Sequence, residues 1–206
     1  MKKSRTLSRG DIWRISKIID KVVRLDCVER YNNRPSARRQ TVAAHSYGVT
    51  AIFAVLYEYL SRNDRVKIDF KKGILTSLFH DIDEVDFGDI ISISKNIIGK
   101  RYFDVVKSYK EDLFEDWSYK PVDEPGGSDP TLMLVKICDL LEGALYSIVQ
   151  YSLYGNKLYE KIVSSFIARL SAVCEEFDYL FKTNLTSHVF EILDKVRDSI
   201  EMEVEL

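Results

Sequence analysis

The stretch Leu78-Phe79-His80-Asp81-Ile82-Asp83-Glu84 places an adjacent histidine and aspartate, followed by a glutamate, inside an apolar segment. Apolar residues recur there at helical spacing, which predicts a helix with one buried face. They are Ile74, Leu75, Leu78, Phe79 and Ile82. Residues three or four positions apart share a helix face, so we expect Glu84 to lie over both His80 and Asp81. Two side chains able to bind metal, with a carboxylate one turn away, predict half of a metal site.

The rest of the chain repeats this helical periodicity. Apolar positions predict helices at about residues 11–27, 41–61, 130–154, 157–181 and 186–202, with one or two shorter ones between 90 and 116. Asp69 is a candidate N-cap of the helix that carries the opening stretch, and Asp129-Pro130 is a candidate start of the helix at 130–154. The sequence shows no strand pattern or repeat. We therefore predict an all-α helical bundle with the metal site between its central helices.

The bulk composition is that of one soluble, well-cored domain. The chain has 206 residues, of which 46% are hydrophobic and 30% are charged, and its formal net charge is −2. This charge gives no overall attraction to a membrane surface, and we expect no stable nucleic-acid partner because no recognised binding motif is present. We expect a single domain over residues 1–206, with a core at about 12–181 and a C-terminal helix at 186–202.

Cysteine usage and hydropathy favour a cytoplasmic protein. Cys27, Cys138 and Cys174 are an odd number without C-x-x-C spacing, which fits a reducing compartment. The opening Met1-Lys2-Lys3-Ser4-Arg5 is like the start of a signal peptide, but charged residues interrupt the segment that follows, so we exclude one. No run approaches the roughly eighteen apolar residues that a membrane span needs.

The first forty residues are basic. They carry twelve lysines and arginines against four acidic residues, a surplus of eight positive charges. Residues 30–39 are polar and interrupted by Pro35, which predicts a loop. Guanidinium groups suit phosphate because their planar donors match its oxygens, but a solvated loop is also rich in arginine, and both interpretations stay open. The arginines of this loop are Arg30, Arg34, Arg38 and Arg39.

Two further side chains are candidates for the other half of the metal site. His45 lies in the first turn of the helix predicted at 41–61, where a lone histidine is also compatible with a structural role. Asp139 lies in an apolar stretch, where a carboxylate is costly unless a cation or a donor meets it. Together with His80 and Asp81 they make a set of nitrogen and oxygen donors suited to Mn²⁺, Co²⁺, Fe²⁺, Zn²⁺ or Ni²⁺, with Mg²⁺ as a further candidate. Such a site performs metal-assisted hydrolysis of phosphate esters.

The order His45…His80-Asp81…Asp139 resembles that of the HD-domain phosphohydrolase superfamily, which is all-helical. The match is closer to the bacterial HD-domain 5′-deoxynucleotidases, which remove phosphate from deoxynucleoside monophosphates. Their pattern has a loop Arg-Trp pair, Val-x-Glu-His-Ser at a helix start, His-Asp-x-x-Glu-Val-x-x-Gly-Asp, and a late aspartate. The corresponding segments here are Arg30-Tyr31, Val42-Ala43-Ala44-His45-Ser46, His80 to Asp89, and Val135-Lys136-Ile137-Cys138-Asp139. The resemblance covers about residues 12–181.

The resemblance implies a role for each residue that matches the metal and acid/base positions. The divalent ion would be bound by His45, His80, Asp81 and Asp139. Glu84 would be the acid/base that handles the nucleophilic water or the leaving oxygen. The implied enzyme is a metal-dependent phosphoric ester hydrolase of the 5′-deoxynucleotidase type.

Other matches imply contacts with the substrate. Arg30 would hold the phosphate, and Tyr31 would lie against the sugar or base. Asp89 would be a second catalytic residue at the sugar or leaving-group end. Lys95 could add positive charge near the phosphate, although it also fits a solvated lysine. Apart from these matches, Arg38 of the arginine-rich loop is a further candidate contact with the substrate.

Two positions depart from the family pattern. Tyr31 replaces the tryptophan, which puts the choice of sugar and base in doubt. Ala44 replaces the glutamate before the first metal histidine, which removes a group able to orient or cap that histidine. Neither departure changes a candidate metal ligand.

Two alternative functions remain. Relatives of the same helical core remove triphosphate, or successive phosphates, from deoxynucleoside triphosphates, including phage enzymes that act on dATP, and the arginine-rich loop could serve a longer phosphate chain. A non-catalytic, nucleotide-binding regulatory HD protein is the second alternative, and the intact ligand set argues against it. The extra helices at both ends and the apolar faces beyond Lys157 predict a homo-oligomer, a dimer or larger.

Overall fold

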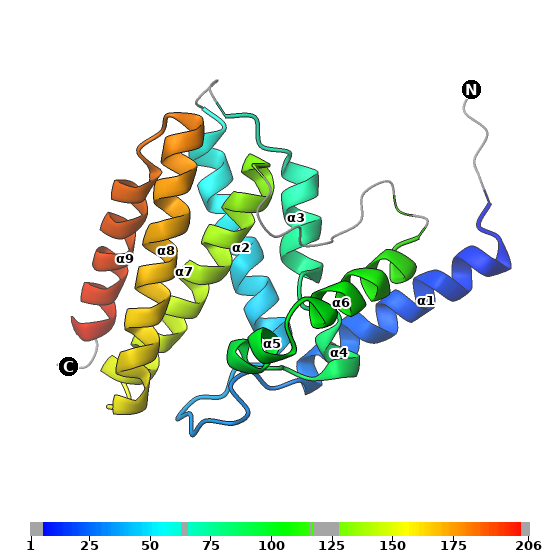
Figure 1. Cartoon of the computed structure of the whole chain (residues 1–206), viewed down its shortest axis with the longest axis horizontal. Coiled ribbons are helices and arrows are strands. Elements are labelled where there is room, and N and C mark those ends of the chain that lie inside the picture. The colour runs from blue at the N-terminus through cyan, green and yellow to red at the C-terminus, as the bar shows by residue number, and fades with distance from the viewer. Residues whose placement is uncertain (1–5, 63–65, 116, 118–127, 203–206) are drawn as a thin grey trace.

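The computed structural model describes residues 6–62, 66–115, 117 and 128–202 (Figure 1). Within them every regular element is helical, and an isolated bridge joins Glu29 to Thr41. The predicted all-α fold class is therefore confirmed. The elements are α1 (Arg9–Arg24), a 3₁₀ turn (Leu25–Cys27), α2 (Val42–Leu60), α3 (Phe70–Phe79), α4 (Glu84–Phe87), α5 (Ser92–Ile98), α6 (Lys100–Leu113), α7 (Pro130–Ser152), a second 3₁₀ turn (Lys157–Tyr159), α8 (Glu160–Phe181) and α9 (Leu185–Met202).

Side-chain caps set the starts of the central helices. Asp129 accepts hydrogen bonds from two amides in the first turn of α7, and Pro130 occupies the first helical position. Asp69 caps α3, and Thr41 caps α2, each through an amide three residues on. These contacts satisfy amides that have no partner within the helix. Both caps expected from the sequence, at Asp69 and Asp129, are present.

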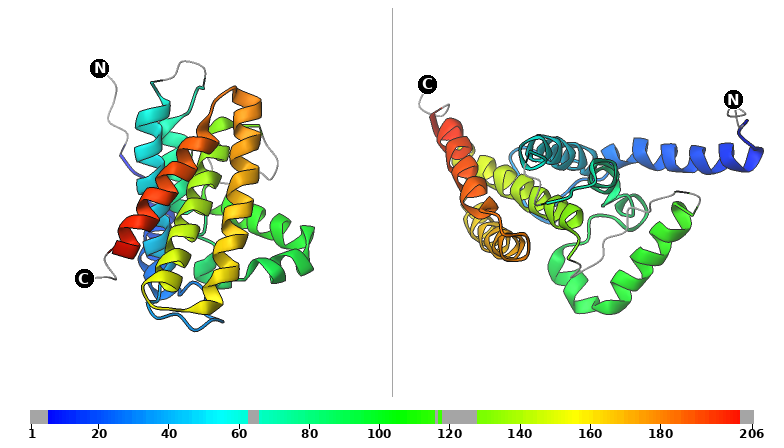
Figure 2. Two further views of the ribbon diagram at one scale, coloured as in Figure 1. Left: turned by 90° about the vertical axis from the view of Figure 1, so that its left-hand side faces the viewer. Right: turned by 90° about the horizontal axis from the view of Figure 1, so that it is seen from above.

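The long helix α7 lies at the centre of the bundle (Figures 1 and 2). It packs against α2, α3, α8 and α9, and most of its side chains are buried. The main apolar core forms between these helices, with Phe53 of α2, Leu134 and Leu141 of α7, and Leu170 of α8 among its fully or almost fully buried members. The candidate ligand Asp139 therefore projects from the most deeply buried helix of the fold.

The segment that carries the His80-Asp81 pair differs from the sequence-based expectation. α3 ends at Phe79, and residues 80–83 form tight turns before α4 begins at Glu84. The Glu84 amide donates to the Asp81 carbonyl at 3.0 Å, so the expected continuous helix, with Glu84 one turn above His80, is wrong. In a continuous helix the His80 carbonyl would accept the Glu84 amide. It accepts instead from the ammonium of the buried Lys110 on α6.

The helix α1 projects from the body of the molecule (Figures 1 and 2). Ile18 faces inward, where it packs with Ile82 and Phe114 in a small second core. The other large aliphatic side chains of α1 are between 40% and 68% exposed. They are Ile12, Ile15, Ile19, Val22 and Val23, and we call them the α1 stripe.

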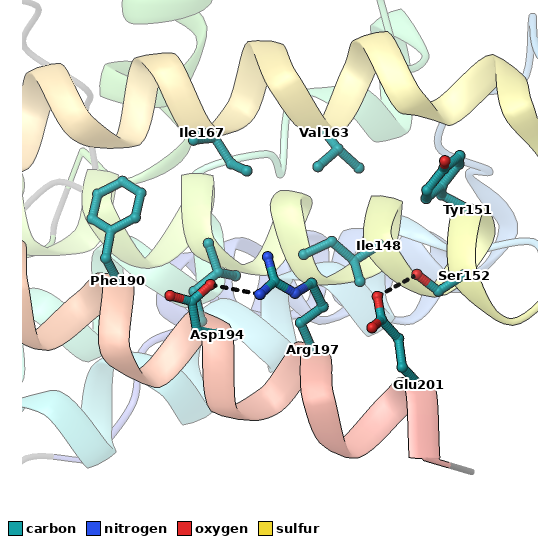
Figure 3. Close-up of a pocket in the computed structure, with 10 residues that line it drawn as sticks. Ile148, Tyr151, Ser152, Val163, Ile167, Phe190, Asp194, Arg197 and Glu201 are labelled. Carbon is teal, nitrogen blue, oxygen red and sulfur yellow. Dashed lines mark hydrogen bonds and ion pairs between the residues drawn. The ribbon is translucent and has the colours of Figure 1, made fainter. Parts of the chain in front are cut away.

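A surface hollow of about 590 Å³ lies between α7, α8 and α9 (Figure 3). Its lining includes apolar side chains such as Ile148 and Phe190, and also Asp194 and Arg197, which form an ion pair of 3.1 Å. Its lining includes none of the candidate site residues. In the part of the chain that the structure describes, no helix is both long and apolar enough to span a membrane.

Candidate metal centre

The four candidate metal ligands come from three segments. His45 lies in the first turn of α2, His80 and Asp81 in the turn after α3, and Asp139 in the middle of α7. These three helices pack against one another. The side chain of His45 is fully buried, whereas the side chains of Asp81 and Asp139 are 20% and 18% exposed. The cluster is thus closed by protein on the imidazole side and reachable from solvent on the carboxylate side.

The donor atoms of His45, His80 and Asp81 all lie within 4.8 Å of one another, at separations that suit one ion, and Asp139 adjoins this group through His45. The Nε2 atoms of His45 and His80 are 3.2 Å apart. Asp81 Oδ2 lies 3.1 Å from His80 Nε2 and 3.6 Å from His45 Nε2, and Asp139 Oδ1 lies 3.3 Å from His45 Nε2. Nitrogen and oxygen ligands about 2.0–2.2 Å from a shared ion lie roughly 3.0–3.5 Å from one another at tetrahedral or octahedral angles.

The hydrogen bonds of the two imidazoles also favour a cation. His45 Nδ1 lies 2.5 Å from Glu142 Oε2, and His80 Nδ1 lies 2.9 Å from the Ser77 carbonyl. Because both partners are acceptors, each Nδ1 carries the hydrogen and each Nε2 presents a lone pair. Two lone pairs that face each other beside two carboxylates repel unless a positive charge lies among them. The residues present therefore fit a divalent metal ion.

Both carboxylates of the cluster are held in the ionised form. Burial alone would raise the pKa of Asp139, but the charge of Lys136 and the contact with His45 outweigh it and keep that pKa well below its usual range. Lys136 Nζ lies 2.6 Å from Asp139 Oδ2. Burial also acts to raise the pKa of Asp81, but the contact with His80 outweighs it and lowers that pKa below its usual range. Ionised carboxylates are the form that binds a metal.

Glu142 and Gln40 belong to the centre although the sequence analysis did not identify them. Glu142 is buried on α7 three residues after Asp139, and its Oε2 contacts His45 Nδ1. Gln40 Nε2 donates to Glu142 Oε1 at 2.5 Å, and Arg30 Nη1 donates to Glu142 Oε2 at 3.4 Å and to Gln40 Oε1 at 3.1 Å. The i,i+3 spacing of Asp139 and Glu142 on one helix face was the available signal. Glu142 thus connects the candidate phosphate-binding arginine to a candidate metal ligand.

Glu84 and Lys95 form an ion pair beside the cluster. Glu84 is almost fully buried, and its Oε1 accepts from Lys95 Nζ at 3.2 Å. Its Oε2 is buried with no hydrogen-bond partner among the described residues. Burial and the charge of Asp81 raise the pKa of Glu84 to about 9, against the opposing charge of Lys95. A metal ion held by Asp81 would act in the same direction as Lys95.

Tyr31 is hydrogen-bonded to Asp89 through its backbone amide. The Tyr31 amide donates to Asp89 Oδ2 at 2.8 Å, and Tyr31 has a positive φ of 55°. Its ring stacks on Tyr146 with centroids 5.2 Å apart, and its hydroxyl is buried without a hydrogen-bond partner among the described residues. One face of the Tyr31 ring is therefore covered by protein. Asp89 anchors the loop that carries Arg30 and Tyr31.

Arg38 is held in its loop through its backbone carbonyl. Its side chain is exposed, and its carbonyl accepts hydrogen bonds from the Tyr146 hydroxyl at 2.7 Å and from Gln150 Nε2 at 2.8 Å. The loop is thus held by its backbone at this position. Its guanidinium remains in solvent.

A family model described as 5′-deoxynucleotidase YfbR-like matches residues 17–188 of this chain. A curated relative, the 4′-phosphooxetanocin A phosphatase of Priestia megaterium, is 32% identical over 104 residues, which are 50% of this chain and 54% of that protein. The chain therefore spans about half the length of this relative.

Solved structures share the fold. An HD-domain phosphohydrolase of Listeria innocua has a TM-score of 0.63 and 17% identity, with 91% of this chain and 97% of that chain covered. A protein of Pyrococcus horikoshii OT3 has a TM-score of 0.60 and 23% identity, with 89% of this chain and 98% of that chain covered. The HD phosphohydrolase of cyanophage S-2L is bound to dA and one catalytic Zn²⁺ ion. It has a TM-score of 0.59 and 13% identity, with 90% of this chain and 95% of that chain covered.

Proposed function

This chain belongs to the YfbR-like 5′-deoxynucleotidase family, and we propose that it is a metal-dependent 5′-deoxynucleotidase. In the proposed reaction the oxygen of a water molecule bonds to phosphorus, the bond from phosphorus to the 5′ oxygen breaks, and that oxygen leaves with a proton. The products are a deoxynucleoside and phosphate. The observation that carries the proposal is the convergence of His45, His80 and Asp81, with Asp139 beside His45. Next to them lies the buried Glu84, whose Oε2 has no hydrogen-bond partner among the described residues.

Two relatives support a phosphate-removing enzyme. The relative from Priestia megaterium is named as a phosphatase, and the cyanophage phosphohydrolase is bound to dA and a catalytic Zn²⁺ ion. Their names favour removal of phosphate from a nucleoside-like compound at a divalent metal. We extend that chemistry to this chain as part of the proposal.

A divalent ion is proposed to be held by His45, His80, Asp81 and Asp139. When bound it would polarise the phosphoryl group and lower the pKa of a bound water. Mn²⁺, Co²⁺, Zn²⁺, Fe²⁺, Ni²⁺ and Mg²⁺ are all candidates, because the affinity order of the donors does not choose among them.

The proposed role of Glu84 is to hold and move a proton at Oε2. Its Oε1 is occupied by Lys95, which leaves Oε2 to take a proton from the attacking water or to give one to the leaving oxygen. Arg30, oriented by Glu142 and Gln40, is proposed to bind the phosphate oxygens. Lys95 would add positive charge near them.

The deciding experiment incubates metal-depleted protein with each deoxynucleoside mono- and triphosphate while Mn²⁺, Co²⁺, Zn²⁺ or Mg²⁺ is added in turn. We expect phosphate to be released from monophosphates. Release of triphosphate from dATP would instead establish a triphosphohydrolase, and no product with any nucleotide would favour a regulatory protein.

Variants of two proposed ligands complete this test. His80→Ala and Asp139→Ala should lose activity together with bound metal. Lys71→Ala, at an exposed position on α3, is the control and should keep both. Wild-type turnover in either ligand variant would show that the metal site is assigned wrongly.

We also propose that the chain forms a single HD domain and assembles into a homo-oligomer. The exposed α1 stripe supports assembly, because burying five aliphatic side chains on each of two copies is favourable. Light scattering that shows a monomer at micromolar concentration would end this proposal. The free state of Cys27, Cys138 and Cys174 supports a cytoplasmic location, which we propose as well.

A further inference from the structure

A charged side chain without a role in the proposed reaction is almost completely buried beside the metal centre. Lys110 of α6 is 2% exposed. Its ammonium donates to the carbonyl of His80 and lies 3.1 Å from Asp83 Oδ1. Both partners belong to the turn between α3 and α4. A buried ammonium is costly unless it is paired, so this contact ties α6 firmly to the turn.

The local sequence does not explain why α3 ends at Phe79. Residues 80–83 contain neither glycine nor proline, so no helix breaker is present. The backbone nevertheless changes to bonds between residues three apart, from Ile82 N to the Phe79 carbonyl at 3.2 Å and from Glu84 N to the Asp81 carbonyl at 3.0 Å. The second bond diverts the Glu84 amide from the His80 carbonyl, which accepts from Lys110. A contact from α6 is therefore present at the point where the α-helical bonding stops.

The turn carries two adjacent residues whose donor atoms converge. Here His80 Nε2 and Asp81 Oδ2 are 3.1 Å apart, and they lie 3.2 Å and 3.6 Å from His45 Nε2. The turn that Lys110 contacts therefore holds two consecutive residues whose donor atoms meet beside His45.

We propose that Lys110 is a positioning residue of the metal centre. With Asp83 it forms a clamp that holds residues 80–83 in the turn and thereby aims His80 and Asp81 at the same ion. The proposal rests on the proposed function in taking those two side chains as metal ligands. Lys110 acts through the backbone and through Asp83, and it contacts neither the ion nor the substrate.

The test is the Mn²⁺ affinity of the full chain, measured by isothermal titration calorimetry without nucleotide. Lys110→Met/Asp83→Asn removes both buried charges together, so neither is left unpaired. We expect this variant to keep its helical circular dichroism spectrum and to bind Mn²⁺ about 10–100-fold more weakly than the wild type, as when a partner that orients a metal ligand is lost. Lys110→Gln/Asp83→Asn keeps a neutral polar pair with a side chain one bond shorter. This second variant should also bind Mn²⁺ about 10–100-fold more weakly than the wild type, and it is measured in place of the first variant if the first does not fold.

The matched control is Lys21→Met. Lys21 Nζ lies 2.5 Å from Asp86 Oδ2 on α4, so this substitution removes an ion pair next to the turn without touching residues 80–83. We expect wild-type Mn²⁺ affinity. Wild-type affinity in a folded Lys110/Asp83 double variant, or an equal loss in Lys21→Met, would overturn the clamp. If the wild-type chain binds Mn²⁺ but hydrolyses no nucleotide, the proposed function fails, and the affinities of the variants still decide the clamp.

Discussion

Replacing Glu142 by glutamine tests whether this buried carboxylate orients His45. The two oxygens of Glu142 accept from three donors, namely His45 Nδ1 and Gln40 Nε2 at 2.5 Å each and Arg30 Nη1 at 3.4 Å. Glutamine keeps one acceptor and turns the other into a donor, so at least one of the three loses its acceptor, and Arg30 loses a countercharge. A hydrogen bond to a charged group contributes about 1.5–3 kcal/mol. Loss of the partner that orients a metal-binding histidine lowers metal affinity about 10–100-fold.

We therefore expect Glu142→Gln to lower the free energy of unfolding by about 2 kcal/mol in urea titrations. In calorimetry it should bind Mn²⁺ about 10–100-fold more weakly than the wild type. Glu176→Gln changes an exposed glutamate on α8 and should alter neither quantity. A folded Glu142→Gln protein with wild-type Mn²⁺ affinity would contradict this role of Glu142, because the hydrogen bond to His45 Nδ1 would then have no effect on metal binding.

Three further predictions concern packing, pH and metal. Gly73→Ala should destabilise the fold by about 1–3 kcal/mol in urea titrations, because its Cβ would lie 1.9 Å from Cζ of the fully buried Phe53; unchanged or higher stability would contradict this packing. Burial acts to raise the pKa of Asp178, but hydrogen bonds from Thr183 and Thr186 outweigh it and lower that pKa. The stabilisation that ionised Asp178 contributes is therefore complete above the unfolded pKa of about 3.9 and is lost as pH falls toward the lower folded pKa. The difference in unfolding free energy between wild type and Asp178→Asn should shrink from pH 7 to pH 3. A difference independent of pH would contradict this prediction. Removing metal with a chelator should lower the melting temperature, since a ligand at a hundred times its Kd stabilises by about 2.7 kcal/mol; an unchanged melting temperature would argue against a bound ion.

Much of the fold was predictable from local patterns. Apolar periodicity predicted the long helices, and the capping residues Asp69 and Asp129 predicted where two of them begin, because caps and helix faces depend on neighbours a few residues away. The helix boundary at Phe79 could not be predicted in this way. At this boundary the His80 carbonyl accepts from Lys110, thirty residues further along the chain, and no rule of helix propensity contains that contact.

The candidate site also has features that were predictable from the sequence and features that were not. The side chains that are chemically able to bind a metal could be identified without the structure, since His45, His80, Asp81 and Asp139 are unusual in an apolar helical context. The hydrogen-bond partners that orient these side chains became visible only when the helices were packed together. Glu142 meets His45 across 97 positions of sequence, a pairing that exists because α2 and α7 pack together. Periodicity describes the faces of single helices, whereas the partner of a buried polar group is chosen by which faces the whole core brings into contact.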